Sequence, residues 1–220
     1  MNHQDPSPLE RFRTAIDALP LVAILRGITP PEATTIGQAL CDAGFHLIEV
    51  PLNSPRALDS IRLLAAQLPD CLVGAGTVLE ASEVWAVHEA GGRLVVAPNF
   101  DDTVVAEARA AGMAVIPGVA TPSEAFAALK IGATALKLFP AEAIPPEVLR
   151  AWRAVIPAEA TLLPVGGIVP EKIAGYRAAG ASGFGLGSAL YRPGDDARAV
   201  AARARRFVAA WDAANGRFTA

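Results

Sequence analysis

The segment ALKLFP (135–140) places Lys137 between apolar neighbours, in a pattern typical of a buried strand. Burial disfavours the charged ammonium and lowers the pKa of a lysine, and a neutral amine can attack a carbonyl to form a Schiff base. The other two lysines, Lys130 and Lys172, are predicted at the end and in the first turn of helices. The structural alternative for Lys137 is a lysine that only holds a phosphate or pairs with a carboxylate.

A carboxylate, that of Glu49, also lies among apolar residues of a predicted strand, in LIEVPLN (47–53). Strand alternation puts Glu49 on the face opposite Ile48 and Val50, so its side chain can point into the interior of a closed sheet. A buried carboxylate is usually paired or catalytic, and near a Schiff-base lysine it could act as a general acid–base. A salt bridge to Arg26 or Lys137 is the alternative.

Two glycine-rich segments predict an anion site. VGGI (165–168) is expected to close the seventh strand, and GLGS (185–188) is expected to lie in the eighth. Glycines allow backbone N–H groups to approach a phosphate closely, and a following helix N-terminus favours negative charge. We therefore expect Gly166, Gly167, Gly187 and the Ser188 hydroxyl to bind a phosphate, unless these residues only form tight turns.

These residues need strands that bring them to one place. Proline near helix starts and glycine after helix ends separate eight short apolar runs, which predict strands at 21–26, 46–52, 72–78, 93–99, 114–119, 135–140, 161–167 and 183–190. Eight alternating strand–helix units predict an α/β fold, a single (β/α)8 TIM barrel over residues 21–215, preceded by a tail and short helix at 1–20. An open doubly wound sheet would show G-x-G-x-x-G after its first strand, where the chain has LRGITPPEA.

Composition excludes several other classes of protein. The 220 residues are 52% hydrophobic and 19% charged, with a net charge of −3, so binding to nucleic acid through bulk charge is not expected. The first residues are polar, unlike a signal peptide, and apolar runs stay below the ~20 residues of a membrane span. Cys41 and Cys71 lack a metal-ligand spacing and are expected to be free buried thiols in a cytoplasmic protein.

The motifs VAILRGITP, IEVPLNSP, VGAGTVL, IPGVAT, ALKLFPAE, PVGGI and GLGSALY, in this order, resemble the 2-keto-3-deoxy-6-phosphogluconate/galactonate aldolases. The resemblance implies a (β/α)8 class I aldolase, a homotrimer that needs no metal or other cofactor. It assigns Lys137 as the Schiff-base lysine and Glu49 as the general acid–base. Arg26 and Thr77 would hold the carboxylate and reacting centre of the pyruvate half, and the two glycine turns would bind the phosphate.

The same resemblance gives an expectation about the substrate. Asn53, Val165 and the LRG segment with Arg26 are similar to the galactonate type, whereas Glu142 in FPAE is similar to the gluconate type. The expected reaction is reversible cleavage of 2-dehydro-3-deoxy-6-phospho-D-galactonate to pyruvate and D-glyceraldehyde 3-phosphate. The alternatives are the C4 epimer or 4-hydroxy-2-oxoglutarate as main substrate, another phosphate-binding barrel isomerase or synthase, and a non-catalytic sugar-phosphate-binding protein.

Overall fold

The strands of the computed structural model, which describes residues 6–216, lie within the predicted runs but are shorter at their ends. Nine strands are present in this part of the chain: β1 Leu21–Ile24, β2 Leu47–Pro51, β3 Leu72–Gly76, β4 Leu94–Val96, β5 Ala114–Ile116, β6 Gly118–Val119, β7 Leu136–Leu138, β8 Leu162–Pro164 and β9 Phe184–Leu186. The last strand ends before Gly187, so the prediction that GLGS lies wholly in a strand was wrong. Gly187 and Ser188 begin the following loop instead.

The strands are parallel and close into a single (β/α)8 barrel. One sheet runs in the order β5-β4-β3-β2-β1-β9, and a second runs β6-β7-β8. A bridge between Val165 and Gly185 joins β8 to β9. The fifth barrel strand is split into β5 and β6 by Pro117, which has no N–H to donate to a ladder. The Lys137 N–H donates to the Pro117 carbonyl oxygen at 2.9 Å, which carries the sheet across this break.

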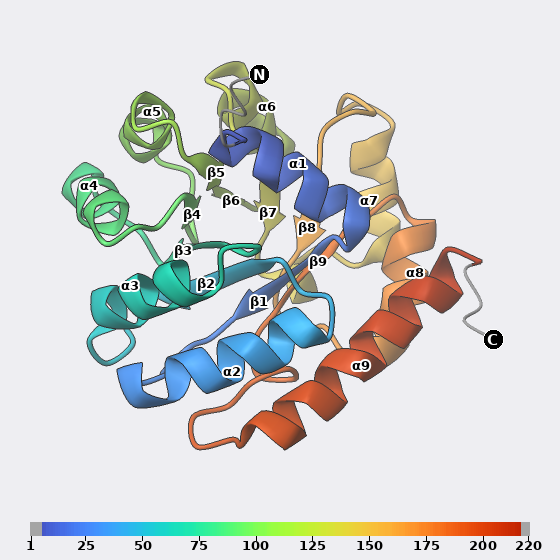
Figure 1. Ribbon diagram of the computed structural model, residues 1–220. Helices are drawn as coiled ribbons and strands as arrows, with labels where there is room; N and C mark the ends of the chain where they lie inside the picture. Colours follow the sequence, from blue (N-terminus) through green and yellow to red (C-terminus); the bar gives the residue numbers. More distant parts are fainter. Residues whose placement is uncertain (1–5, 217–220) are drawn as a thin grey trace, which may run out of the picture.

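The helices form a ring around the barrel (Figure 1). The ring consists of α2 Pro30–Asp42, α3 Ala57–Gln67, α4 Ala81–Glu89, α5 Asp102–Ala110, α6 Pro122–Lys130, α7 Pro146–Arg153, α8 Pro170–Ala178 and α9 Ala197–Ala214. The structure also has the helix α1 Pro8–Ala18 and the 3-10 turn η1 Ala141–Ala143. Proline occupies the first position of α2, α6 and α8, as predicted. The proline of NSPRA (53–57), in contrast, precedes its helix: Arg56 after it is left-handed (φ 50°), and α3 begins at Ala57.

The predicted glycine ends are confirmed at five helices. Each of these glycines has a positive φ, from 68° to 103°, a conformation that glycine adopts without the steric cost of a Cβ: Gly44, Gly91, Gly112, Gly132 and Gly180. The turn that follows each of them returns the chain to the N-terminal end of the next strand. The strand N-termini therefore collect at one end of the barrel, called the bottom here, and the strand C-termini at the other, the top.

The hydrophobic core has two parts that follow strand alternation. Alternate residues face the helices, and the others fill the barrel interior, where Val22, Leu47, Leu72, Leu94, Val96, Ala114, Ile116, Ala135 and Leu163 pack together. Phe12 and Ala15 of α1 belong to this interior cluster. Helix α1 therefore closes the bottom of the barrel, across which it lies in Figure 1.

The N-terminal segment predicted as tail and helix contains α1, while residues 1–5 lie outside the described residues. Ser7 caps this helix: its hydroxyl accepts from the Glu10 N–H, and the Glu10 carboxylate accepts from the Ser7 N–H at 2.7 Å. No helix among residues 6–216 combines the length and apolar character needed to cross a membrane.

Candidate active site

Glu49 and Lys137 both point into the upper barrel interior. Glu49 alternates with Ile48 and Val50, which pack among the outer core residues, and Lys137 alternates with Leu136 and Leu138 in the same way. The two side chains are 1% and 5% exposed. They line one small cavity together with Val22, Ile24, Val96, Ile116, Leu163, Val165 and Gly185. The predicted orientation of Glu49 is therefore confirmed.

The cavity shifts both groups towards their neutral forms. Burial raises the pKa of Glu49 to about 7, while the positive charges of Lys137 and Arg26 partly oppose the rise. Burial also lowers the pKa of Lys137, against the attraction of Glu49 and with added repulsion from Arg26. A carboxyl group that titrates near neutrality and an amine that loses its proton readily are the properties that acid–base and Schiff-base chemistry require.

Both reactive groups keep capacity for a ligand. Among the described residues, Oε2 of Glu49 is buried without a hydrogen-bond partner. Nζ of Lys137 lies 4.7 Å from the centroid of the Phe139 ring, and no direct ion pair to Glu49 is formed in the described part of the chain. An unpaired buried carboxylate oxygen is costly, and such groups concentrate where a substrate completes the hydrogen bonding.

Gly76 makes the position of Glu49 possible. A Cβ added at Gly76 would lie 1.9 Å from Oε2 of Glu49, far inside van der Waals contact. Glycine at the end of β3 therefore leaves the space that the carboxylate occupies. Sequence reasoning assigned no role to Gly76, although its place in VGAGT, at the end of a strand next to that of Glu49, was the available signal.

Arg26 is held at the mouth of the barrel by the two loops after β2 and β3. Its Nη1 donates to Oδ1 of Asn53 at 2.7 Å, and its Nη2 contacts Oγ1 of Thr77 at 3.5 Å. The buried Ser54 hydroxyl accepts from the Gly27 N–H at 2.9 Å. The structure thus brings Arg26 and Thr77 together, as the sequence predicted. The contact of Arg26 with Asn53 and the backbone anchor supplied by Ser54 were not predicted.

Thr77 has an unusual backbone. Its φ of 57° lies in the left-handed region, which a β-branched residue adopts at a cost of about 1–3 kcal/mol. This conformation places Oγ1 beside the guanidinium of Arg26. Strain of this kind is concentrated at ligand-binding sites, where the surrounding structure maintains it.

The turn of Gly166 and Gly167 also lies at the top of the barrel. Both residues have positive φ values, 113° and 57°. A Cβ on either would lie 2.5–2.6 Å from a carboxylate oxygen of Glu142, so this side chain rests against the turn. Nζ of Lys172 donates to the Gly167 carbonyl oxygen at 2.8 Å. The exposed Lys172 lies in the first turn of α8, as predicted, and its contact with the glycine turn was missed.

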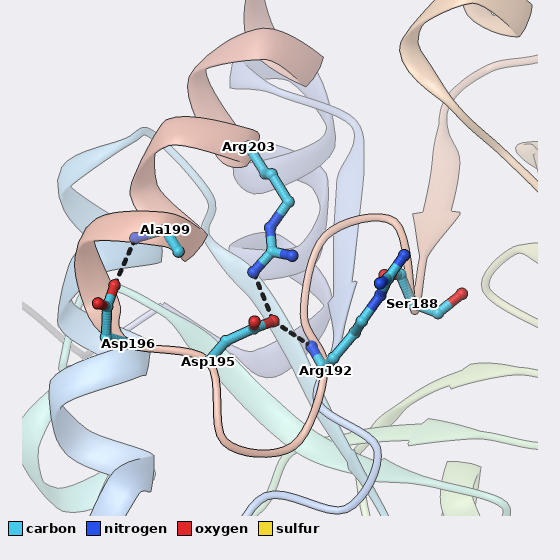
Figure 2. Close-up of polar contacts among 6 residues, drawn as sticks. All are labelled: Ser188, Arg192, Asp195, Asp196, Ala199 and Arg203. Carbon is cyan, nitrogen blue, oxygen red and sulfur yellow. Dashed lines mark hydrogen bonds and ion pairs between the residues drawn. The ribbon is translucent and has the colours of Figure 1, made fainter.

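The second glycine segment leads into a loop fixed by hydrogen bonds and an ion pair (Figure 2). Nε of Arg192 donates to the Ser188 carbonyl oxygen at 3.0 Å, and the Arg192 N–H donates to Oδ2 of Asp195 at 2.6 Å. Arg203 of α9 pairs with the same carboxylate. Figure 2 shows the Ser188 hydroxyl directed away from this network. Space is open beside Gly187, where an added Cβ would meet nothing within 4 Å.

Comparison with known proteins gives one family and two similar enzymes. The family model described as "KDPG and KHG aldolase" matches residues 13–200. The 2-dehydro-3-deoxy-6-phosphogalactonate aldolase of Escherichia coli is 46% identical over 88% of this chain and 95% of its own length. A probable enzyme of the same name from Rhizobium meliloti is 46% identical over 90% and 93%.

Solved structures agree in fold. A native KDPGal structure superposes with a TM-score of 0.88 at 46% identity, covering 90% of this chain and 97% of the other. A KDPG aldolase from Legionella pneumophila, with pyruvate captured as a covalent carbinolamine intermediate, gives a TM-score of 0.77 at 26% identity over 93% and 98%. This chain, with its buried lysine and glutamate inside a closed parallel barrel, is therefore an aldolase of the KDPG and KHG aldolase family.

Proposed function

We propose that this protein is a class I aldolase that reversibly cleaves 2-dehydro-3-deoxy-6-phospho-D-galactonate to pyruvate and D-glyceraldehyde 3-phosphate. The observation that carries the proposal is the placement of Lys137 and Glu49 in one buried cavity, with both pKa values moved towards neutrality. The covalent carbinolamine captured with pyruvate in the Legionella pneumophila relative supports the proposal.

The covalent step begins at Lys137. Burial increases the fraction of neutral amine, whose lone pair attacks the C2 ketone of the substrate to give a carbinolamine. Loss of water then leaves an iminium carbon. The positive charge on the iminium nitrogen supplies the electron sink for the next step, so the proposed mechanism requires no metal ion.

Glu49 completes the cleavage. Its carboxylate, directly or through one water, removes the proton of the C4 hydroxyl. The C3–C4 bond breaks as the C4 oxygen becomes the aldehyde of glyceraldehyde 3-phosphate, and its electron pair moves to the enamine. The carboxyl group then returns a proton to C3, and hydrolysis of the iminium releases pyruvate and regenerates Lys137. A pKa of about 7 suits both directions of proton transfer.

The two ends of the substrate match the polar groups around the cavity. The guanidinium of Arg26, oriented by Asn53, is suited to the carboxylate of the pyruvate half, and Thr77 offers a hydroxyl beside it. At the other end, Gly166, Gly167, Gly187 and Ser188 are proposed to bind the phosphate. The exposed Glu142 must turn away from the turn for an anion to enter.

Val165 and the names of the two relatives support the galactonate configuration at C4 of the substrate. Val165 is 8% exposed and lines the cavity beside Lys137 and Glu49. A threonine here would offer a hydroxyl to the substrate where valine offers a methyl group. Val165→Thr is therefore expected to raise kcat/KM for the gluconate epimer relative to the galactonate epimer, measured by coupled assay with both substrates. An unchanged ratio would remove Val165 from the argument.

Borohydride reduction with pyruvate tests the chemistry most directly. The expected product carries one added pyruvate less one oxygen atom, and peptide mapping should place it on Lys137. Reduction without pyruvate is the control. Absence of an adduct, or an adduct on another residue, would contradict the Schiff-base proposal.

Assembly and location complete the proposal. We infer a homotrimer in the cytoplasm, serving galactonate degradation. The large apolar side chains Leu79, Trp85 and Phe126 are 43–48% exposed, and a subunit interface would cover surface of this kind. Light scattering coupled to size exclusion measures the assembly, and a monomeric mass would contradict it.

A further inference from the structure

Three potential metal ligands meet near the bottom of the barrel, away from the aldolase cavity. Cys41 lies in the last turn of α2, His46 immediately precedes β2, and Cys71 immediately precedes β3. Both sulfur atoms and one ring nitrogen of His46 lie within 4.8 Å of one another. Separations of 5 and 25 residues along the chain hid this cluster from sequence reasoning, which treated the cysteines as isolated thiols.

The ligands are incompletely satisfied. Nδ1 of His46 is buried and has no hydrogen-bond partner within the described ranges. Sγ of Cys71 donates a weak hydrogen bond to the Phe45 carbonyl oxygen at 3.5 Å. A buried imidazole nitrogen without a partner costs free energy, and a bound ion is one of the established ways in which such a nitrogen is satisfied.

The cluster has a route to solvent and a suitable charge environment. His46 lines a cavity of about 620 Å³ that also contacts Arg11, Ala15 and Asp70. The guanidinium of Arg11 donates to the Cys71 carbonyl oxygen at 2.8 Å, and the exposed carboxylate of Asp70 lines the same cavity, so these two charges offset each other near the cluster. Two thiolates then need one divalent cation for neutrality.

We propose that Cys41, His46 and Cys71 bind a thiophilic divalent cation, Zn²⁺ in preference to Mg²⁺ or Ca²⁺, with a water as fourth ligand. Two thiolates and one imidazole form a soft donor set that selects zinc over hard cations. Tetrahedral bonds of about 2.3 Å to sulfur and 2.0 Å to nitrogen put the ligand atoms about 3.5–3.8 Å apart. The observed separations, all within 4.8 Å, therefore need a contraction of at most about 1.3 Å, which side-chain rotations supply.

Such a site would link α2 to the starts of β2 and β3. Its effect is on stability, because the strand N-termini that carry it lie at the end opposite Glu49 and Lys137. A cation that binds the folded chain preferentially raises the melting temperature by mass action. The site is separate from the proposed aldolase reaction, so cleavage activity does not depend on it.

Cobalt is the probe, since Co²⁺ occupies zinc sites and reports its ligands by absorption. Titration of chelator-treated, reduced protein should give thiolate-to-cobalt charge transfer and the intense visible bands of tetrahedral Co²⁺, saturating at one equivalent. Zn²⁺ should abolish these bands and raise the melting temperature. Because the chain has two cysteines, all thiolate absorption must come from Cys41 and Cys71.

Variants assign each ligand. Cys41→Ser or Cys71→Ser should reduce the charge transfer by about half, and the double variant should lose it with the thermal shift. His46→Gln should weaken Co²⁺ affinity at least tenfold, whereas His88→Gln on α4 is the matched control and should not change it. Wild-type cobalt spectra that are octahedral and lack charge transfer would overturn the proposal independently of variant folding. A Cys41–Cys71 disulfide that forms equally fast with and without Zn²⁺ would also overturn it.

Discussion

The bottom of the barrel interior is filled by apolar side chains of α1 and the strands, whereas the top holds two ionisable groups in a cavity. One carboxylate oxygen there has no hydrogen-bond partner among residues 6–216. Phe12 at the bottom is 2% exposed, about as buried as Glu49 at the top. Equal burial thus has opposite meanings. At the bottom it stabilises the fold, and at the top it opposes stability and tunes chemistry. Changes at the top should therefore reduce activity more than stability, and changes at the bottom should reduce stability more than activity.

The largest expected effect is the loss of the amine. Lys137→Ala should lower kcat by about 10⁴-fold or more, because no covalent intermediate can form. The folded protein should not lose stability, since a buried cationic group is removed. Lys130→Ala is the control, an exposed lysine at the end of α6, and should keep full activity. Steady-state cleavage assays measure the activity, and thermal melts measure the stability. An active Lys137→Ala variant would refute the catalytic role of the top of the barrel.

Glu49→Gln comes next. Turnover should fall by about 10²–10⁴-fold, because the general acid–base is lost, while trapping of pyruvate by borohydride should persist. In the wild type, kcat/KM should rise with pH through about 7 as Glu49 ionises. That limb should be absent in the variant. Full activity of Glu49→Gln would return Glu49 to a structural role.

Glu49→Gln also tests how the buried carboxyl group affects the free energy of unfolding. The folded-state pKa of Glu49 is raised from 4.5 to about 7, so the folded protein binds this proton more tightly than the unfolded chain. Its contribution to stability is therefore present below pH 4.5 and lost as pH rises to about 7. Relative to Glu49→Gln, the wild type should lose up to roughly 3 kcal/mol of unfolding free energy over this window. Urea unfolding at several pH values measures the difference.

A change at the bottom of the barrel should lower stability and leave activity unchanged, the opposite of Lys137→Ala. Phe12→Ala should reduce the free energy of unfolding by about 3–5 kcal/mol, because the interior loses a buried ring. The kcat of the folded enzyme should stay near the wild-type value. Leu9→Ala on the same helix is the matched control, since Leu9 is 41% exposed. A low kcat in fully folded Phe12→Ala would show that the two ends are coupled.

Gly76→Ala should affect both stability and activity, each by less than the changes above that act on it most strongly. The added methyl group would displace the Glu49 carboxylate, costing about 1–3 kcal/mol by overpacking and up to about 10²-fold in kcat by misplacement. Gly175→Ala in α8 is the control, with nothing nearer than 3.9 Å, and should stabilise the helix by about 1 kcal/mol. Unchanged kcat in Gly76→Ala would mean that Glu49 has room to move.

The sequence was sufficient for features with a local signal. Alternation and glycine helix ends predict the barrel, the inward orientation of Glu49 and Lys137, and the shared mouth to which Arg26 and Thr77 belong. It was insufficient where the outcome depends on packing between distant segments. The contact of Glu142 with the glycine turn, the fit of Gly76 against Glu49 and the meeting of Cys41 with Cys71 each require the closed barrel. The split of the fifth barrel strand at Pro117 is an intermediate case. The sequence shows the proline, but it does not show how the residues on either side of it pair with the neighbouring strands.

The pairing of β1 with β9 sets the order in which the chain can be completed. Leu21 is in register with Phe184, and Ala23 with Leu186, so the first strand finds its second neighbour only when nearly the whole chain exists. At about 5–20 residues per second, a chain under synthesis carries an open strand edge for roughly 10–30 s. An open hydrophobic edge is a template for intermolecular pairing. Chains that terminate before β9 should therefore aggregate rather than form a partial barrel.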